Sequence, residues 1–375
     1  MGKKQRQSNV ELFRIVMIFA IVMHHSILYG FFEGHLTLAQ TYVSELFASL
    51  GKVGVAGFMM ITGYFSIHKM KNNKASLQST HRIVWFYSLL YLILFWHTSE
   101  VSRSLAFKAL FPIIGGNYWF VTSFMMTMLL APFINRGFQA LEQKESKQLL
   151  FVLMILLTVL QLVPHQELAL GNTMLFILFY LTGGYIRQYV DPKQVARWKI
   201  IGLIIMNYIV MNIGNFISTY FGYEAMPFSS NESVFVYLMA TLAFILFLGF
   251  DLGSIRWINT ISSMTFAVYL IHDNPIVREF LWRKALKLHK LDHLSLGQMA
   301  LAIVVSSLII FIFGLVIESI RLTVVSLFKD KKTSPQTEAN TNNKLTVEDN
   351  DLDIAYTVAL PKITRAEYRK QQKRR

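Results

Sequence analysis

Arg14 and His25 are the two residues whose types and spacing most directly indicate chemistry. Both lie within the first apolar run, Leu12 to Tyr29, and charged or titratable groups at membrane depth mark a functional site by default because they are costly there. On an α-helix, eleven residues turn through about 1100°, roughly 20° beyond three full turns, and rise about 16 Å. Both side chains therefore leave the same helix face. We expect them to reach one cavity that links the two faces of the membrane, with the cation near one surface and the imidazole towards the other.

Three further polar residues accompany this pair. Glu11 is close enough to Arg14 on a helix to pair with it or orient it. His24 points about 100° away from His25, so only His25 is expected to share the face of Arg14 closely. His272 ends the ninth apolar run and could face the same chamber as His25, although a hydrogen-bonded interfacial role is commoner for a histidine at a helix end.

Several chemistries lack the residues that they need. The sequence contains no GxxxxGK[ST] loop, no HExxH pair or other compact metal-binding cluster, and no GxSxG elbow. It contains no cysteine, which excludes disulfides, a thiol nucleophile and thiolate metal sites. We therefore predict no metal site and no permanently bound cofactor.

The chemistry that remains is acyl transfer, with an imidazole as general base on an acceptor hydroxyl. Two other classes stay open at this point. Arg14 and His25 could form the substrate or proton path of a multispan transporter or exporter of a sugar or small solute, or the chain could be a structural partner in envelope assembly.

The composition predicts that these residues sit in a membrane protein. Apolar residues make up 54% of the chain and charged residues 15%, with a mean hydropathy of +0.43, whereas a soluble domain carries about a quarter charged residues. The net charge of +14 does not indicate a nucleic-acid partner, because Lys and Arg lie between apolar runs and in the tail. Lys3, Lys4 and Arg6 resemble a signal-peptide start, but no small-residue cleavage site follows, so the first run is read as a retained span.

Apolar runs of spanning length predict an all-α integral membrane protein with about ten transmembrane helices. The runs lie near 12–29, 48–67, 83–97, 118–135, 149–163, 173–187, 199–217, 234–250, 257–273 and 299–326. Alternate loops (30–47, 164–172 and 218–233) hold no Lys or Arg, while the loops between them are basic. This positive-inside pattern places both termini in the cytoplasm.

Two regions complete this organisation. Loop 274–297 is basic although the topology places it outside; it either re-enters as an amphipathic element at the outer surface, which an even span count favours, or the count slips by one. We predict a membrane domain over 9–328 and a disordered cytoplasmic tail over 329–375, because the start of this tail is polar and poor in large apolar residues. The basic end of the tail, Arg365 to Arg375, is more often a solvated segment than a lipid-binding one.

The small and aromatic residues of the apolar runs are most simply explained by helix packing and by the membrane interface. Gly51, Gly54 and Gly57 have the spacing that lets membrane helices approach closely, and the alternative is that bare backbone makes room for a long, thin ligand. Tyr118 and Trp119 follow a Gly-Gly-Asn break and suit the interfacial aromatic belt.

Four stretches, in this order, resemble the membrane acyltransferase 3 family. Glu11 to Arg14 (ELFR), with His25 after ten intervening residues, is similar to the Arg-x10-His motif of that family. The other three are Val55 to Tyr64 (VAGFMMITGY), Tyr118 to Asn135 (YWFVTSFMMTMLLAPFIN) and Phe266 to Asn274 (FAVYLIHDN). The resemblance extends from residue 9 to about residue 325, the whole predicted membrane part.

This resemblance implies a ten-helix O-acyltransferase of the plasma membrane. Such an enzyme moves acetyl from cytoplasmic acetyl-CoA to a hydroxyl of a cell-envelope or exported polysaccharide, or of a lipid-linked sugar. The paired residues of the family map onto Arg14 and His25. The donor phosphates are expected near Arg14 and the basic inner loops, where Arg82 is the nearest match to a donor-binding position. Some members carry a further extracytoplasmic domain of the SGNH type; with only a short polar tail here, transfer is expected to finish in the membrane domain or with an envelope-assembly partner protein.

Overall fold

The computed structural model describes residues 6–72, 74–98, 100–162, 171–223 and 226–330, and these residues contain helices and no strand. The helices are α1 (Ser8–Tyr29), α2 (Leu38–Ala48), α3 (Gly51–Ser66), α4 (Lys74–Phe95), α5 (Arg103–Leu110), α6 (Trp119–Gln139), α7 (Gln143–Met154), α8 (Gly171–Tyr189), α9 (Arg197–Tyr220), α10 (Val234–Leu248), α11 (Arg256–His272) and α12 (Leu296–Asp330). Short 3-10 or π segments, η1 to η6, cover Phe31–Glu33, Ile155–Val159, Leu160–Leu162, Pro227–Ser229, Phe280–Ala285 and Leu288–Lys290.

Each predicted apolar run coincides with a helix, although the fifth is interrupted where α7 gives way to the π turn η2. In the described part of the chain, five segments are long and apolar enough to cross a membrane by length and composition: Ser8–Glu33, Leu38–Ser66, Arg197–Tyr220, Pro227–Leu248 and Leu296–Leu327. Two other helices do not meet this criterion: α11 has only 17 residues, and the first turn and a half of α4 is polar. The chain is therefore a multi-pass membrane protein, and the number of ten spans and the side of each terminus stay predictions.

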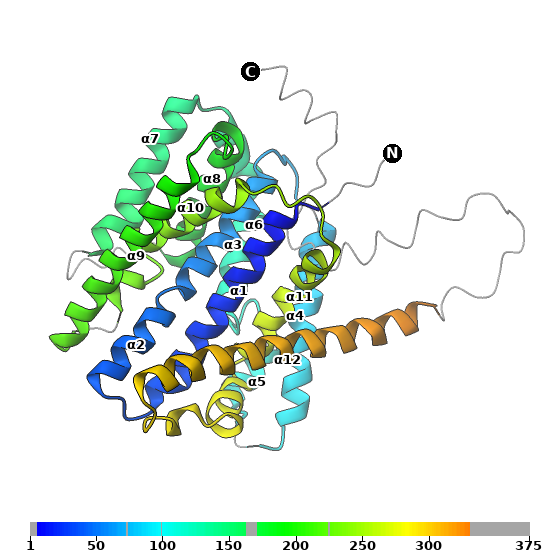
Figure 1. Ribbon diagram of the computed structural model, residues 1–375. Coiled ribbons are helices and arrows are strands. Elements are labelled where there is room, and N and C mark those ends of the chain that lie inside the picture. Colours follow the sequence, from blue (N-terminus) through cyan, green and yellow to red (C-terminus); the bar gives the residue numbers. More distant parts are fainter. Residues whose placement is uncertain (1–5, 73, 99, 163–170, 224–225, 331–375) are drawn as a thin grey trace, which may run out of the picture.

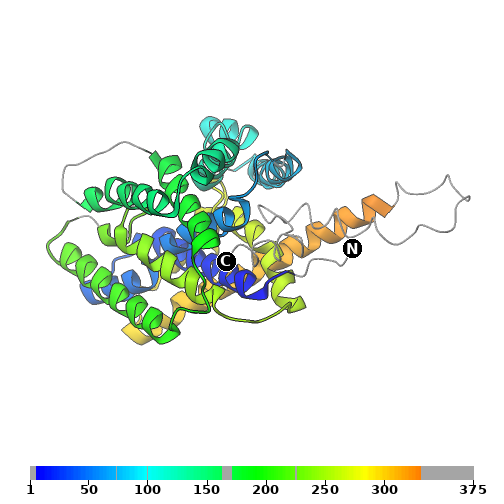
Figure 2. The ribbon, with the colours of Figure 1, turned by 90° about the horizontal axis from the view of Figure 1, so that it is seen from above.

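The helix α1 lies in the middle of the bundle and packs against α3, α11 and α12 (Figures 1 and 2). α3 in turn lies between α1 and α8. The far half of α12 extends away from the other helices in both views. α12 continues to Asp330, two residues past the predicted domain boundary, and the rest of the predicted tail lies outside the described residues.

Two glycines let α3 and α8 meet backbone to backbone. A Cβ on Gly63 would lie 1.8 Å from the carbonyl oxygen of Tyr180, and a Cβ on Gly183 would lie 2.0 Å from that of Met60. No side chain fits at either position, so glycine is required for this crossing. The crossing fixes α3 firmly against α8.

The buried and exposed faces of α9 differ in polarity. Buried Asn207 and Asn215 donate to the carbonyl oxygen of Phe235 and the hydroxyl of Ser229, both at 2.9 Å. The opposite face exposes large apolar side chains instead: Ile201, Leu203, Ile205, Met206, Ile209, Val210, Ile213 and Ile217. Apolar groups outside and satisfied amides inside are the arrangement expected in lipid.

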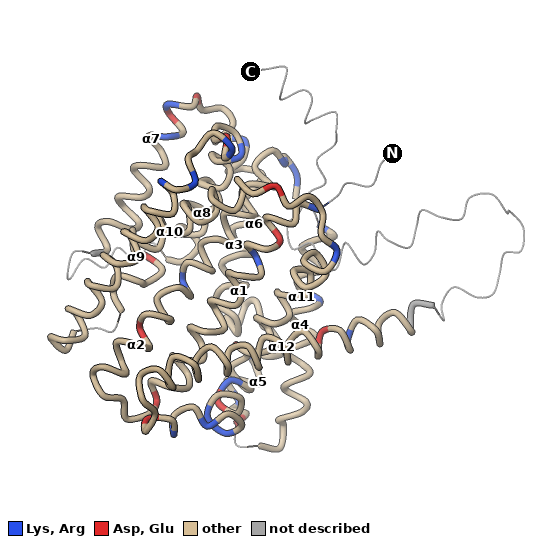
Figure 3. Tube along the Cα trace, viewed as in Figure 1, with Lys and Arg blue, Asp and Glu red and all other residues tan. Residues whose placement is uncertain are grey.

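Charged residues gather at the two ends of the bundle and leave most of the middle free of them (Figure 3). We call these the Ser8 end and the Tyr29 end, after the first and last residues of α1. α3 is antiparallel to α1, since Gly51 lies against His24 and Gly57 against Phe13. The basic segment that follows α3 therefore belongs to the Ser8 end.

The basic loop between α11 and α12 forms a short amphipathic element at the Tyr29 end. Its segments η5 and η6 bury Trp282 and Leu288. Arg283 and Lys284 point outward and pair with acidic residues of the same end, Arg283 with Glu33 at 3.6 Å and Lys284 with Glu100. A helical element with partly neutralised charges is thus present, while its place at the outer surface and the even span count stay predictions.

Candidate active site

The imidazoles of His25 and His272 face each other in the interior of the bundle. His25 lies on α1, and its Nδ1 is 3.0 Å from the Nε2 of His272, the last residue of α11. The other ring nitrogen of His272 is 2.6 Å from the carbonyl oxygen of Val268, one turn earlier on α11. Both histidines are buried. The predicted approach of His272 to His25 is confirmed as geometry.

Aromatic and charged groups surround this pair at the Tyr29 end. Asp273 Oδ1 lies 3.5 Å from His25 Nδ1, and the ring of Tyr29 lies 5.3 Å from the His25 ring between centroids. Arg278 covers Tyr29, with its guanidinium 4.6 Å from the ring centroid and its Nη1 donating to the hydroxyl at 3.2 Å. His25 therefore has a carboxylate beside it and a cation one ring further away.

A cavity of about 440 Å³ lies beside His25, and we call it the His25 cavity. Its lining comes from α1, α3, α6 and α11: Ile18, Ile21, His24, His25, Gly51, Lys52, Val55, Phe58, Trp119, Phe120, Phe266 and Tyr269. The mostly apolar wall with a few polar groups is typical of small-molecule sites.

Three glycines of α3 bring Lys52 and the His25 cavity close to α1. A Cβ on Gly51 would lie 2.2 Å from the Cβ of His24, and one on Gly54 would lie 2.6 Å from the carbonyl oxygen of Met17. A Cβ on Gly57 would meet the Phe13 ring at 3.0 Å. The close-packing interpretation of this motif is thus confirmed.

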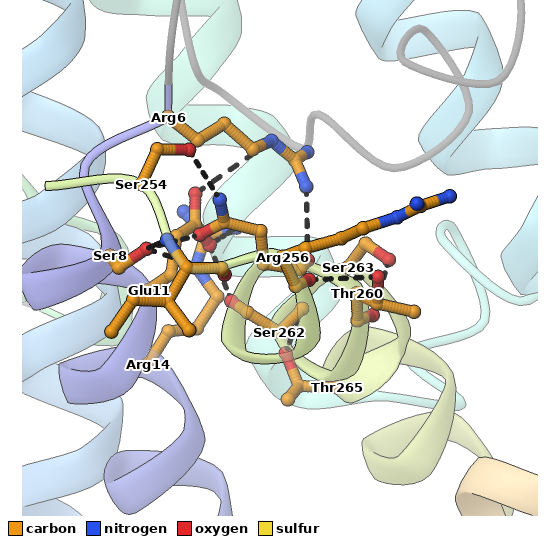
Figure 4. A network of polar contacts seen from close by, with 12 residues as sticks. Arg6, Ser8, Glu11, Arg14, Ser254, Arg256, Thr260, Ser262, Ser263 and Thr265 are labelled. Atoms are coloured by element: carbon orange, nitrogen blue, oxygen red, sulfur yellow. Dashed lines mark hydrogen bonds and ion pairs between the residues drawn. The ribbon is translucent and has the colours of Figure 1, made fainter.

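Arg14 belongs to a polar network at the Ser8 end (Figure 4). Its Nη1 lies 3.9 Å from a carboxylate oxygen of Glu11, and Arg6 Nε lies 3.9 Å from the other oxygen. Glu11 also accepts a hydrogen bond from Ser262 of α11. The Nε of Arg14 is buried and has no hydrogen-bond partner in the described structure. Two cations around one carboxylate leave this cluster with a net positive charge.

A family model described as an acyltransferase domain matches residues 7–318, from the start of α1 into α12. The chain belongs to the acyltransferase 3 family. No curated protein and no solved structure matches it. The match agrees with the resemblance seen in the sequence, and it gives the reaction class of the chain: acyl transfer by a membrane enzyme.

In this acyltransferase, one backbone carbonyl sets the protonation pattern of the two histidines. A carbonyl oxygen only accepts, so His272 Nδ1 carries the proton that it donates to Val268. In the neutral pair, His272 Nε2 then accepts and His25 Nδ1 donates to it. The Nε2 of His25 keeps its lone pair, and His25 lines the cavity. The cavity wall thus includes an imidazole whose tautomer is set by its bond to His272.

The shared helix face of Arg14 and His25 is only partly reflected in the cavity. Ile18 and Ile21, which lie between them on α1, line the His25 cavity. Arg14 is not among the residues that line it; its guanidinium is buried and paired with Glu11. The lining of the His25 cavity ends one turn short of Arg14, so one continuous cavity from Arg14 to His25 stays a prediction.

The positions of His24 and Arg82 both differ from expectation. His24 was expected to point away, yet it lines the same cavity as His25, because that cavity extends between α1 and α3 as far as Gly51. The Nδ1 of His24 is 2.9 Å from the carbonyl oxygen of Ala48, so one of its nitrogens is already engaged. Arg82 is exposed on α4 and lines neither cavity described here. Its predicted donor-binding role has no support from its position.

A second cavity, of about 430 Å³, opens at the Ser8 end and includes Lys69; we call it the Lys69 cavity. Its lining is Ser66, Lys69, Lys71, Asn72, Ser76, Leu77, Phe124, Met128, Ala131, Pro132, Asn135 and Tyr180. Asn135 holds this region together by donating to the carbonyl oxygens of Ser66 and Lys69, at 2.8 and 2.7 Å. Burial lowers the pKa of Lys69 to about 8, which shows a cation poorly solvated by water.

Some residues of the site did not stand out in the sequence. The two motifs around Tyr118 and Asn274 meet directly: Asn274 donates to the Tyr118 hydroxyl at 2.7 Å, and that hydroxyl donates to the carbonyl oxygen of Leu270 at 3.0 Å. This bond ties α6 to the end of α11, next to His272. Lys52 was also overlooked, although a lysine inside an apolar run is the same signal that drew attention to Arg14.

Proposed function

We propose that this membrane acyltransferase is an O-acetyltransferase of the plasma membrane. It takes acetyl from cytoplasmic acetyl-CoA and transfers it to a hydroxyl of a cell-envelope or exported glycan. The observation that carries the proposal is the setting of His25, which lines a cavity and is bonded through Nδ1 to His272, itself bonded to the carbonyl oxygen of Val268. A positioned imidazole of this kind is the usual general base for activating a hydroxyl.

The positive charge at the Ser8 end matches the negative charge of the acetyl-CoA phosphates. The Lys69 cavity offers a partly buried cation, and the cluster of Arg6, Glu11 and Arg14 has a net positive charge. Phosphates bind strongly to such groups through charge-assisted hydrogen bonds. The positive-inside pattern assigns this end to the cytoplasm, where acetyl-CoA is made.

Aromatic rings of α3 and α6 lie between the two cavities. Phe124 lines the Lys69 cavity and Phe120, one turn earlier on α6, lines the His25 cavity. Their rings are stacked at 6.2 Å between centroids, and Phe58 of α3 packs edge-on against Phe120 at 6.3 Å. We assign the passage of the acyl arm to this aromatic seam. Its apolar rings keep water from the thioester, which would otherwise be hydrolysed.

The transfer step uses one proton relay. The Nε2 of His25 takes the proton of the acceptor hydroxyl while the oxygen attacks the thioester carbonyl. The C–O bond forms, the C–S bond breaks, and the imidazolium returns its proton to the leaving thiolate. His272 accepts from the other side of the His25 ring throughout, so the ring keeps its orientation as it gains and loses charge.

Purified protein in lipid vesicles tests the reaction class. The proposal expects thiol release from acetyl-CoA that depends on added glycan acceptor and is abolished in His25→Ala. Accumulation of a solute inside the vesicles without thiol release would instead show a transporter. Acetyl-CoA binding by His25→Ala, measured in parallel, shows whether the variant is still folded.

The acceptor class needs a test in cells. Deletion of the gene is expected to remove an ester-linked acetyl from an envelope glycan, detected by mass spectrometry as a base-labile acetyl. An unchanged set of acetyl esters, under conditions where the gene is expressed, would contradict the glycan part of the proposal while leaving the reaction class intact.

A further inference from the structure

Lys52 places an ammonium group at the His25 cavity. It lies near the start of α3, and its Nζ lies over the Trp119 ring, 5.4 Å from the centroid, in a cation–π contact. The side chain is half-buried, and in the described part of the chain it forms neither a hydrogen bond nor an ion pair. Such a group at membrane depth is costly unless an anion compensates it.

The charges around Lys52 do not supply that anion at close range. Asp273 and Glu232 are the carboxylates that act on it electrostatically, but neither forms an ion pair with it in the described structure. Asp273 lies beside His25 instead. Arg278 adds a second cation near His25. The cavity therefore offers a site for a negative charge.

Trp119 supplies the other half of a recognition site. Its ring packs on Phe120 and Phe176, with centroids 6.4 and 5.9 Å away, so the indole is held in a fixed position while it lines the cavity. A rigid indole beside a cation suits a sugar ring that carries an anionic substituent. The sugar can pack against the indole while its charge takes the ammonium over from the ring.

We infer that Lys52 and Trp119 select an acceptor glycan that carries a carboxylate or phosphate on the sugar to be acetylated. This inference rests on the proposed function, since it describes the acceptor of that same site. The charged group binds Lys52, the ring stacks on Trp119, and a free hydroxyl of the sugar reaches His25 Nε2. Lys52 is thus a specificity-determining residue for the acceptor.

The opposing possibility is that Lys52 stabilises the oxyanion formed when the thioester is attacked. That role would affect every acceptor equally, because the oxyanion comes from the donor. Recognition of acceptor charge affects only charged acceptors. The two roles therefore separate in a comparison of acceptors.

The experiment uses three soluble acceptors that differ at one position: methyl glucoside, methyl glucuronide and methyl glucoside 6-phosphate. Acetyl transfer from labelled acetyl-CoA is measured with wild-type protein in vesicles, with Lys52→Met, with Lys52→Arg and with Lys290→Met. Lys290 is exposed at the same end of the bundle and does not line the cavity, so it controls for the loss of surface charge.

Wild-type protein is expected to favour one or both anionic acceptors in kcat/KM. Lys52→Met should lower kcat/KM for these by about tenfold to a hundredfold more than for methyl glucoside, the usual range for a lost charged hydrogen bond. Lys52→Arg should keep the preference and Lys290→Met should leave it unchanged. The anionic acceptor that is favoured identifies a carboxylate or a phosphate as the ligand.

Two results would overturn the inference: no preference for charge in the wild-type protein, or equal losses on all three acceptors in Lys52→Met. Equilibrium binding of the same sugars by calorimetry keeps the test independent of turnover. If no thiol is released from acetyl-CoA with any acceptor, the proposed function fails. A Lys52-dependent preference for the charged sugars in calorimetry would then still support the binding site.

Discussion

His25 Nδ1 and His272 Nε2 are 3.0 Å apart although 247 residues separate them in the chain. The bond joins the first helix to the end of α11, two helices that pack directly against each other. It ends at the carbonyl oxygen of Val268, which gives the pair a direction: the proton lies on Nδ1 of His25, and the basic nitrogen is Nε2.

His272 is expected to act as a positioning residue for His25. His272→Leu removes the acceptor of the His25 N–H and should lower kcat by roughly tenfold to a hundredfold, as loss of partners that orient a functional imidazole does. The KM for acetyl-CoA should change little. His272→Gln should restore part of kcat, because its amide oxygen can accept the same proton. Equal kcat values in the Leu and Gln variants would contradict this role.

His25 and His24 should differ although both line the cavity. His25→Ala should lower acetyl transfer by about 10²–10⁴-fold, the usual contribution of a general base. His24→Ala should cost far less, since one nitrogen of His24 is bonded to the carbonyl oxygen of Ala48 and no second histidine orients the ring. Transfer rates with saturating acetyl-CoA test this. Equal losses would mean that damage to α1, not loss of a base, explains both.

Arg14 is expected to bind the donor and not the acceptor. Arg14→Ala should weaken acetyl-CoA binding, and Arg14→Lys should recover only part of it because a point charge lacks the planar fork of a guanidinium. Equilibrium binding of acetyl-CoA measures this directly. Unchanged affinity in Arg14→Ala would restrict Arg14 to its ion pair with Glu11.

Lys69 should make donor binding depend on pH. Because burial lowers its pKa to about 8, Lys69 is charged below that pH and loses its charge as the pH rises through it. Affinity for the anionic donor should therefore be highest below about pH 8 and fall above it.

In Lys69→Met, affinity at pH 7 should be lower and the fall near pH 8 should disappear. Lys193→Met is the control, since Lys193 is an exposed residue paired with Asp251 at 3.5 Å. Isothermal titration with CoA at several pH values gives the comparison. A fall near pH 8 that persists in Lys69→Met would assign the titration to another group.

Gly63→Ala should destabilise the bundle. The added Cβ would lie 1.8 Å from the Tyr180 carbonyl oxygen, so α3 and α8 must separate, at a cost on the order of 1–3 kcal/mol in the free energy of unfolding. Gly202→Ala is the matched control, because a Cβ there meets no heavy atom within 4 Å. Thermal unfolding in detergent should show a lower midpoint for Gly63→Ala only.

The positions of the helices were readable from the sequence because apolar runs and their flanking polar residues are local signals. Arg14, His25 and His272 were readable too, since each is a polar residue in or beside an apolar run. Helix geometry predicted that Arg14 and His25 share a face, and Ile18 and Ile21 on that face do line the cavity.

What lay beyond the sequence were the contacts between distant helices. Nothing local shows that the lining of the His25 cavity stops short of Arg14, or that Gly51 lies against His24 where both line the cavity. The bond between Tyr118 and Asn274 joins residues 156 positions apart. Such pairings depend on how the helices cross, and one sequence carries no record of that.

The helix α3 sets a length inside the enzyme. Lys52 near one end lines the His25 cavity and Ser66 at the other end lines the Lys69 cavity, and the helical rise between them is about 21 Å. Because bare backbone at Gly63 and Gly183 holds α3 against α8, the helix cannot slide to shorten or lengthen this distance. Under the proposed function, this rise sets the shortest usable donor: a donor bound by its phosphates at the Lys69 cavity needs an arm long enough to bring its acyl group to the His25 cavity.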